Sequence, residues 1–416
     1  MPRPTAAISA LLVVFSLALA PGANAASSAD KSLTKVLAKA MAGAGGSSGA
    51  YVLDSTDQRV LYRIRPETPR VLASNTKLFT TSAALDDLGA DATFQTAVLG
   101  DGVKEEDGTW TGNLYLKGGG DPTFGSTTFD RKAYGGGAAT VQQLALQLDR
   151  AGITSVTGRI FGDATLFDAL RGGPDSGYGT SIWVGPLSGL SYNRGLASER
   201  GSSFQTNPPL FAAGKLEAAL EARGIDVGKS SRSGVTPADA VQLAAVESPS
   251  LGKLVSMTMK PSDNFFAEML LKQLGGRPGS TKAGARASAA HAATFGATIN
   301  QVDGSGLAVS NRASPHSVVR LLDSMQSEDT FKVFKAGLPI AGKDGTLNNR
   351  MRRGPARGKC RAKTGTITGV STLSGYCSAR NGDTIVFSIL MNGVSTGGAH
   401  TLQDRMVEAI AGYDGR

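Results

Sequence analysis

The stretch that decides the fold of this 416-residue chain is Lys359-Cys-Arg-Ala-Lys-Thr-Gly-Thr-Ile-Thr-Gly-Val-Ser-Thr-Leu-Ser-Gly-Tyr-Cys377. Its polar centre runs into Thr368-Gly369, and this pair predicts a turn between two antiparallel strands. Lys363 and Gly365 on the first strand would offer a fixed positive charge and an open backbone edge, with which an extended peptide can pair. We therefore interpret this strand as the rim of an active site.

The same hairpin holds both cysteines of the chain, Cys360 and Cys377. A turn at Thr368-Gly369 places them directly opposite each other, where the Cα atoms of antiparallel strands are within disulfide reach. An even pair favours a disulfide when the protein is exported, as the N-terminus indicates, so we predict a cross-strand bridge. Two cysteines and three scattered histidines do not suggest a zinc site, and we expect neither a metal nor a cofactor.

Residues 1–25 have the pattern of a signal peptide. Arg3 supplies a positive charge, residues 6–20 form a short apolar run, and Ala23-Asn24-Ala25 is a small-x-small cleavage site. The run is short for a membrane span and ends at Pro21-Gly22. We therefore expect an exported protein without a transmembrane anchor after processing, either extracellular, associated with the cell wall or periplasmic.

The rest of the chain divides into regions with two different patterns of predicted secondary structure. Residues 26–95 and 245–416 combine helical patterns with strands, which indicates one α+β domain with an antiparallel sheet built from both parts. Between them, residues 96–244 alternate short β-like segments with glycine-rich turns, so we predict an inserted β-rich domain or domains. The net charge of +9 is spread along the chain and aromatic residues make up only 6%, which argues against a nucleic-acid partner.

Three short motifs follow one another along the chain: Ser74-Asn-Thr-Lys77, Ser262-Asp-Asn264 and Lys363-Thr-Gly365. This trio occurs in penicillin-binding proteins and class A β-lactamases. Ser-x-x-Lys alone is uninformative, since it recurs at Ser28, Ser32 and Ser250. Only the Ser74 motif follows a predicted hairpin and opens a long apolar helix, on which residues three apart share a face.

The first two motifs supply the residues of an acyl-transfer reaction. Ser74 is the expected nucleophile and Lys77 its base, because a buried lysine has a lowered pKa and can accept the hydroxyl proton. Ser262 would relay a proton between Lys77 and the leaving group, while Asn264 would hold the substrate amide. The competing explanation is ordinary helix capping by both serines.

In the third motif, Lys363 would tune the charge of the site. Gly365 would keep the strand edge open to substrate, and the hydroxyls of Thr364 and Thr366 would bind a substrate carboxylate. Taken singly, this motif is better explained as a surface hairpin with ordinary turn residues. Looser competitors for the second and third motifs are Ser191-Tyr-Asn193 and Lys343-Asp-Gly345. The order of the three motifs and the element on which each lies favour the active site.

Four further motifs extend the pattern over nearly all of the mature chain: Gly119-Gly-Asp-Pro122, Ala267-Glu268-x-Leu-Leu271, Asp303-Gly-Ser-Gly306 and Gly375-Tyr376. With them, the chain resembles the class C low-molecular-mass penicillin-binding proteins, which are D-alanyl-D-alanine carboxypeptidases and endopeptidases. This resemblance implies a fold like that of the serine β-lactamases and DD-peptidases, with a large insertion between the first two motifs. The insertion looks shorter here than in the larger family members, which predicts a reduced or missing subdomain.

The resemblance also implies an acyl-enzyme mechanism on peptidoglycan stem peptides. Ser74 would attack the D-Ala-D-Ala carbonyl, and the backbone N–H groups of Ser74 and Thr366 would form the oxyanion hole. Water would then release the shortened peptide, whereas β-lactam antibiotics would acylate Ser74 and leave slowly.

Three other functions compete with a DD-peptidase. Gly45-Gly-Ser-Ser-Gly49 matches the G-x-S-x-G motif of Ser-His-Asp hydrolases, but it precedes a strand where that motif must follow one. A β-lactamase shares all three motifs, yet no Glu-x-x-x-Asn stretch precedes Ser262 to position a deacylating water. A non-catalytic penicillin-binding wall receptor would keep the same pocket without turnover.

Overall fold

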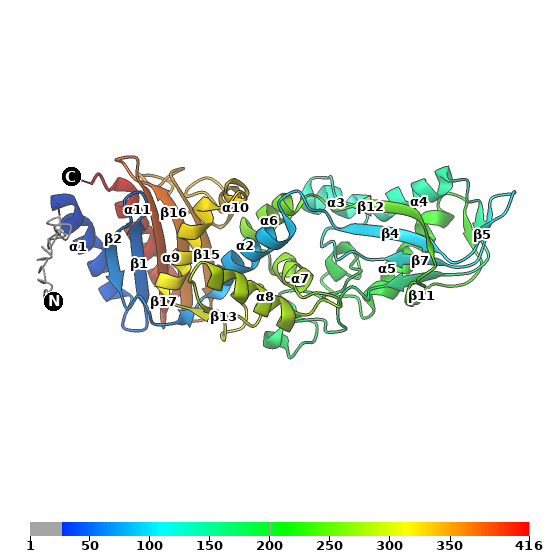
Figure 1. The fold of residues 1–416 in the computed structure, drawn as a ribbon, viewed down its shortest axis with the longest axis horizontal. Helices are drawn as coiled ribbons and strands as arrows, with labels where there is room; N and C mark the ends of the chain where they lie inside the picture. The colour runs from blue at the N-terminus through cyan, green and yellow to red at the C-terminus, as the bar shows by residue number, and fades with distance from the viewer. Residues whose placement is uncertain (1–26, 200, 416) are drawn as a thin grey trace, which may run out of the picture.

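The computed structural model describes residues 27–199 and 201–415, which form an elongated molecule (Figure 1). An antiparallel sheet lies at one end, helices fill the middle, and smaller sheets form the other end. The signal peptide predicted at 1–25 lies outside the described residues. Within those residues, every helix is too short or too polar to cross a membrane.

The sheet at the first end joins the two ends of the chain, in the order β15-β16-β17-β1-β2. Its strands are β1 (Gly49–Asp54), β2 (Arg59–Ile64), β15 (Cys360–Ile367), β16 (Val370–Ser378) and β17 (Thr384–Asn392). Cys360 pairs with Cys377 across β15 and β16, as predicted, and the two form a disulfide with Cα atoms 4.1 Å apart. The pairing of β1 with β17 brings the N-terminal hairpin beside the C-terminal one and joins both parts of the chain in one sheet.

Helices cover both faces of this sheet. On one face, α1 (Ser28–Gly43) and α11 (Thr396–Gly412) pack on each other and bury apolar residues such as Leu37, Met406 and Ile410. On the other face lies α9 (Pro315–Ser324). Helix α1 begins at Ser28, because Ser27 and Asp30 cap it reciprocally.

The middle of the molecule is a helical core beneath β15. Its helices are α2 (Thr76–Leu88), α6 (Leu251–Met259), α7 (Asn264–Gln273), α8 (Thr281–Thr294) and α10 (Phe331–Gly337). Helix α2 is buried on nearly all sides and packs against α6, α7 and α8. A small sheet of order β13-β14-β3 borders this core; its strands are β3 (Arg70–Val71), β13 (Ile299–Asn300) and β14 (Arg312–Ala313).

Two mixed sheets form the other end of the molecule, from chain between the first two motifs. The larger contains β4 (Gln95–Gly100), β7 (Leu114–Lys117), β9 (Ile160–Asp163), β11 (Arg232–Ser233) and β12 (Val241–Glu247). The smaller contains β5 (Val103–Lys104), β6 (Thr109–Thr111), β8 (Ser155–Val156) and β10 (Asp226–Val227).

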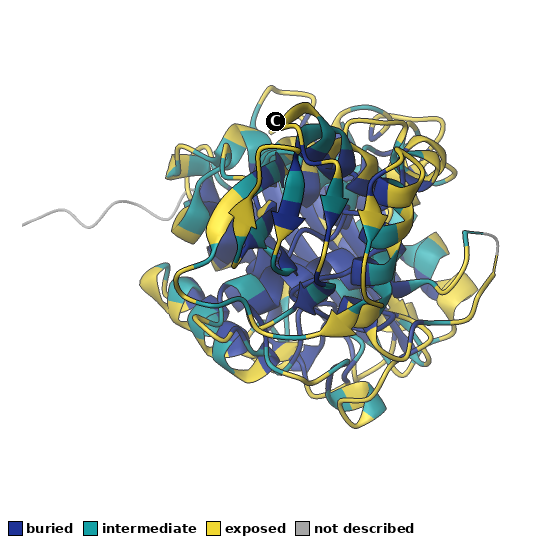
Figure 2. Cartoon of the chain, turned by 90° about the vertical axis from the view of Figure 1, so that its right-hand side faces the viewer, coloured by how far each residue is buried: buried dark blue, intermediate teal, exposed yellow. Residues whose placement is uncertain are grey.

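Three helices accompany these sheets: α3 (Thr127–Tyr134), α4 (Val141–Arg150) and α5 (Pro208–Glu221). Helices α4 and α5 pack on the larger sheet and enclose a separate apolar cluster that includes Leu144 and Leu216. Figure 2 looks onto this end and shows buried residues inside a rim of exposed loops. These sheets match the β-rich insertion expected from the sequence, while the boundaries at 96 and 244 stay a prediction.

Candidate active site

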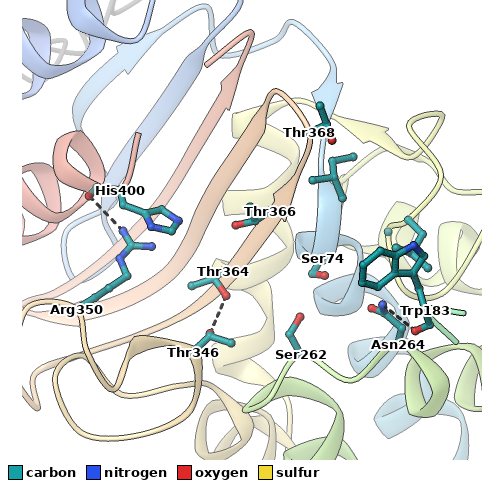
Figure 3. A pocket seen from close by; sticks show the side chains of 13 residues that line it. Ser74, Trp183, Ser262, Asn264, Thr346, Arg350, Thr364, Thr366, Thr368 and His400 are labelled. Carbon is teal, nitrogen blue, oxygen red and sulfur yellow. Dashed lines mark hydrogen bonds between the residues drawn. The ribbon is translucent and has the colours of Figure 1, made fainter. Parts of the chain in front are cut away.

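The three motifs meet at one cavity of about 580 Å³ between β15 and the helical core (Figure 3). Its lining residues are Ser74, Trp183, Ser262, Asn264, Gly306, Leu307, Thr346, Arg350, Thr364, Thr366, Ile367, Thr368 and His400. Five of the eight residues predicted for the site line the cavity. The other three, Lys77, Lys363 and Gly365, lie directly behind its wall.

Ser74 lies in a single 3₁₀ turn, Ala73–Asn75, that leads into α2. The preceding Ala73 has a φ of 46°, a left-handed conformation that costs about 1–3 kcal/mol for a residue with a side chain. Gly306 supports this turn from below, since a Cβ at Gly306 would lie 1.9 Å from the Ala73 carbonyl oxygen. The tight turn brings the Ser74 hydroxyl to the cavity floor, at the start of a buried helix.

Lys77 is fully buried one turn below Ser74, and its ammonium nitrogen lies 3.0 Å from the Ser74 Oγ. The same nitrogen donates to the Asn264 Oδ1 at 2.7 Å and to the Ser305 carbonyl at 2.7 Å. Burial lowers the pKa of Lys77 from 10.5 to about 8, although the carboxylates of Glu268 and Asp303 oppose this shift. A lysine in this state can give up a proton near neutral pH and accept the one from Ser74.

Ser262 and Lys363 form the second pair of the site. The Lys363 ammonium donates to the Ser262 Oγ at 2.8 Å and to the Thr364 carbonyl at 2.8 Å. Burial, with a smaller contribution from the nearby charge of Lys77, holds the pKa of Lys363 well below its ordinary value. Ser262 does not open α7 as expected from the sequence, because Asp263 caps that helix and Ser262 precedes it with a φ of 64°.

Strand β15 lies unusually close to the Ser74 turn. A Cβ at Gly365 would lie 2.2 Å from the Thr372 hydroxyl, 2.8 Å from the Leu72 carbonyl oxygen and 2.9 Å from the Ser74 nitrogen. Only glycine fits this approach. The close packing sets the backbone of Ser74 against the segment that carries the Thr366 amide, as a two-donor oxyanion hole would require.

Asn264 is already engaged by the protein. Its Oδ1 accepts from Lys77, and its amide nitrogen donates to the Trp183 carbonyl at 3.3 Å. This second bond links the core to the segment 181–185 of the insertion and places the Trp183 ring at the cavity rim (Figure 3). Binding of a substrate amide by Asn264 therefore stays a prediction.

A network of buried acids supports Lys77 and was missed by the site prediction. Glu268 on α7 accepts from the backbone nitrogens of Gly304 at 3.0 Å and Ser305 at 2.8 Å. Asp303 accepts from the nitrogen of Gly306 at 2.7 Å. Both acids belong to motifs that carry the family resemblance, but their positions in the sequence did not reveal that their charges act on Lys77.

Trp183, Thr346, Arg350 and His400 are cavity residues that no sequence motif indicated. The Thr346 hydroxyl lies 2.7 Å from that of Thr364, and thereby ties the loop before β15 to the strand. The competitor motif at Ser191 does not line the cavity. Across the described residues, no group of three or more His, Cys, Asp or Glu side chains could hold a metal ion.

Comparison with known proteins agrees with this arrangement. The D-Ala-D-Ala carboxypeptidase 3 (S13) family matches residues 29–198 and 197–413. The chain belongs to this family. A relative called D-alanyl-D-alanine carboxypeptidase, from Actinomadura sp. (strain R39), is 30% identical, and the match covers 89% of this chain and 82% of the relative.

Solved structures share the fold of this S13 family member. Penicillin binding protein 4 (dacB) from Haemophilus influenzae superposes with a TM-score of 0.75 at 21% identity, covering 89% of this chain and 97% of that one. A predatory peptidoglycan endopeptidase from Bdellovibrio bacteriovorus superposes with a TM-score of 0.54 at 20% identity, covering 86% and 90%. The fold is therefore the α+β fold of the penicillin-binding proteins, as the sequence motifs implied.

Proposed function

We propose that this protein is an exported serine D-alanyl-D-alanine carboxypeptidase that shortens peptidoglycan stem peptides through a Ser74 acyl-enzyme. The observation that carries this proposal is the 3.0 Å contact between Ser74 and a buried Lys77 whose pKa is lowered to about 8. Membership of the S13 family and the name of the Actinomadura relative support the substrate class.

Acylation begins when neutral Lys77 accepts the proton of the Ser74 hydroxyl. The Ser74 oxygen then forms a bond to the carbonyl carbon of the penultimate D-alanine, and the carbonyl oxygen becomes an oxyanion. The backbone N–H groups of Ser74 and Thr366 stabilise that negative charge. Loss of one such donor typically costs about 10²–10³ in rate.

Collapse of the tetrahedral intermediate breaks the peptide bond, and the departing nitrogen needs a proton. Ser262 supplies it from its hydroxyl and recovers a proton from the lysines, since Lys363 already donates to its oxygen. The lowered pKa of Lys363 makes this transfer favourable. Water then attacks the acyl-enzyme, Ser74 leaves as the alcohol, and the shortened peptide departs.

The hydroxyls of Thr364 and Thr366 lie on the cavity wall where the terminal carboxylate of D-alanine would bind. A β-lactam presents a carboxylate and a strained amide in a similar relation, so the same site would be acylated by penicillins. Substrate and inhibitors would meet the enzyme after its export.

The decisive experiment measures D-alanine released from a diacylated D-Ala-D-Ala peptide by the mature protein. We expect turnover by the wild type and none by Ser74→Ala, with Ser82→Ala on the same helix as the matched control. A fluorescent penicillin should label the wild type and the control but not Ser74→Ala. Labelling without D-alanine release would support a penicillin-binding receptor, and rapid loss of the label would support a β-lactamase.

A further inference from the structure

The active-site cavity has two chemically different ends. Figure 3 shows Trp183 on one side of Ser74, and Leu307 and Ile367 are further apolar residues of the lining. The other side extends past Thr364 to Arg350 and His400, as Figure 3 shows. Among the lining residues, two are basic and none is acidic. The unequal ends predict that the two halves of a substrate differ in polarity.

Arg350 is held in place by contacts that leave one side of its guanidinium unused. Its Nε and Nη2 donate to the Asp404 Oδ1 at 2.9 and 2.7 Å, and Nη2 also donates to the Gln403 Oε1 at 3.0 Å. Within the described chain, Nη1 has no acceptor, and Figure 3 shows one guanidinium nitrogen pointing toward β15. The side chain is only 11% exposed and lines the cavity, so its unused donor is available to a group bound there.

His400 lies beside this guanidinium at the same end of the cavity (Figure 3). Burial, with repulsion from Arg350, lowers the pKa of His400 below 6.5, so the ring is neutral at pH 7. A neutral imidazole donates one hydrogen bond without adding charge. Asp404 neutralises part of the Arg350 charge from behind, yet its carboxylate does not line the cavity.

The orientation of the substrate decides which of its halves meets Arg350. In the proposed function, on which this inference rests, the terminal carboxylate binds Thr364 and Thr366 while the carbonyl carbon faces Ser74. The acyl half then extends toward Trp183, and the leaving amino acid lies toward Arg350. D-alanine has only a methyl side chain and would not fill this end.

We propose that Arg350 and His400 form a subsite for an anionic side chain on the leaving amino acid. The enzyme would then accept leaving groups larger than D-alanine, and it would favour a D-amino acid whose side chain ends in a carboxylate. Arg350 donates Nη1 to that carboxylate, and His400 supplies a second hydrogen bond. A charge-assisted contact of this kind is expected to raise kcat/KM about tenfold over a neutral side chain of equal size.

The test compares three diacylated peptides that end in D-Ala-D-Ala, D-Ala-D-Glu and D-Ala-D-Gln. The wild type should hydrolyse the D-Glu peptide about tenfold more efficiently than its neutral D-Gln analogue. Arg350→Gln should abolish this preference, so that the D-Glu and D-Gln peptides are hydrolysed with equal kcat/KM. Arg352→Gln is the matched control, because this neighbouring arginine is exposed and does not line the active-site cavity.

Two outcomes would overturn the subsite: equal kcat/KM for the D-Glu and D-Gln peptides, or a preference that survives in Arg350→Gln. If Arg350→Gln fails to fold, His400→Ala and Arg350→Lys should each reduce the preference. Competition with fluorescent penicillin for Ser74 gives a second measurement that needs no turnover. If no peptide is hydrolysed, the carboxypeptidase function fails, and stronger competition by D-Glu than by D-Gln would still support the subsite.

Discussion

Replacement of Glu268 by Gln should make the enzyme more active near pH 7. Glu268 does not touch Lys77, but the two share Ser305: the acid accepts from its nitrogen at 2.8 Å, and the lysine donates to its carbonyl at 2.7 Å. Gln can keep the bonds from Gly304 and Ser305, because both reach the same oxygen, Oε1. The substitution therefore removes a buried negative charge while it preserves most of the local geometry.

The direction of the effect follows from the charges. The carboxylate of Glu268 raises the pKa of Lys77 against the lowering effect of burial, which together leave it at about 8. Removing a charge within about 4–6 Å shifts a pKa by about 1–3 units, and we take the lower limit because a peptide unit intervenes. A pKa near 7 would raise the neutral fraction of Lys77 at pH 7 from about one tenth to about one half.

Two features limit this gain. Burial and the neighbouring Asp303 raise the pKa of Glu268 itself to about 7, so the acid loses its charge as the pH falls below neutrality. The largest difference between the two enzymes is therefore expected near pH 7, and because Glu268 is already partly protonated there in the wild type, it should be about twofold rather than the full fivefold. Above pH 9 Lys77 is neutral in both, and the rates should converge.

The assay is the second-order rate of Ser74 acylation by fluorescent penicillin between pH 5 and 10. In Glu268→Gln, the acid limb of the profile should move downward by less than one unit, since wild-type Glu268 is itself protonated at the lower pH values. Glu408→Gln is the matched control. Glu408 also accepts a hydrogen bond from a backbone nitrogen, that of Ala356, but it lies on α11, outside the cavity lining. A folded Glu268→Gln enzyme with an unmoved or higher acid limb would refute the coupling; a merely structural role would lower the rate equally at every pH.

Two further predictions concern β15. Gly365→Ala should lower the acylation rate by about a hundredfold, because the added methyl would lie 2.9 Å from the Ser74 nitrogen of the expected oxyanion hole. Stopped-flow labelling with fluorescent penicillin measures this rate, and a value within threefold of the wild type would contradict the prediction. Replacing Cys360 and Cys377 by Ala should lower the free energy of unfolding by about 3 kcal/mol, since the disulfide closes a loop of sequence separation 17. Urea denaturation measures that loss, and an unchanged midpoint would show that strand pairing alone holds the hairpin.

The hairpin was predictable because its determinants are local. The turn at Thr368-Gly369 sets the register of β15 and β16, and that register alone places Cys360 opposite Cys377. The helix that begins after Ser74 follows from an apolar run that ends at Gly89. Patterns of this kind depend on residues a few positions apart, so they survive without knowledge of the rest of the fold.

The candidate catalytic residues were predicted from motif order, but the contact between Ser262 and Lys363 is a property of the packed core. Ser74 meets Lys77 through helix geometry, which the three-residue spacing implies. Ser262 meets Lys363 only because α7 and β15 pack on the same cavity, across a sequence separation of 101 residues. The left-handed conformation of Ser262 was also invisible in the sequence, where an ordinary helix cap at that position looked equally suitable.

The chemistry at the two ends of the cavity depends wholly on tertiary structure. Trp183 comes from the insertion, Arg350 from the loop before β15 and His400 from the terminal helix, and no periodicity or motif connects them. They become neighbours because separate apolar clusters set the positions of the sheet, the helical core and the insertion. Local patterns in the chain thus predicted the reacting groups, whereas the long-range packing of those clusters determined which side chains line the cavity.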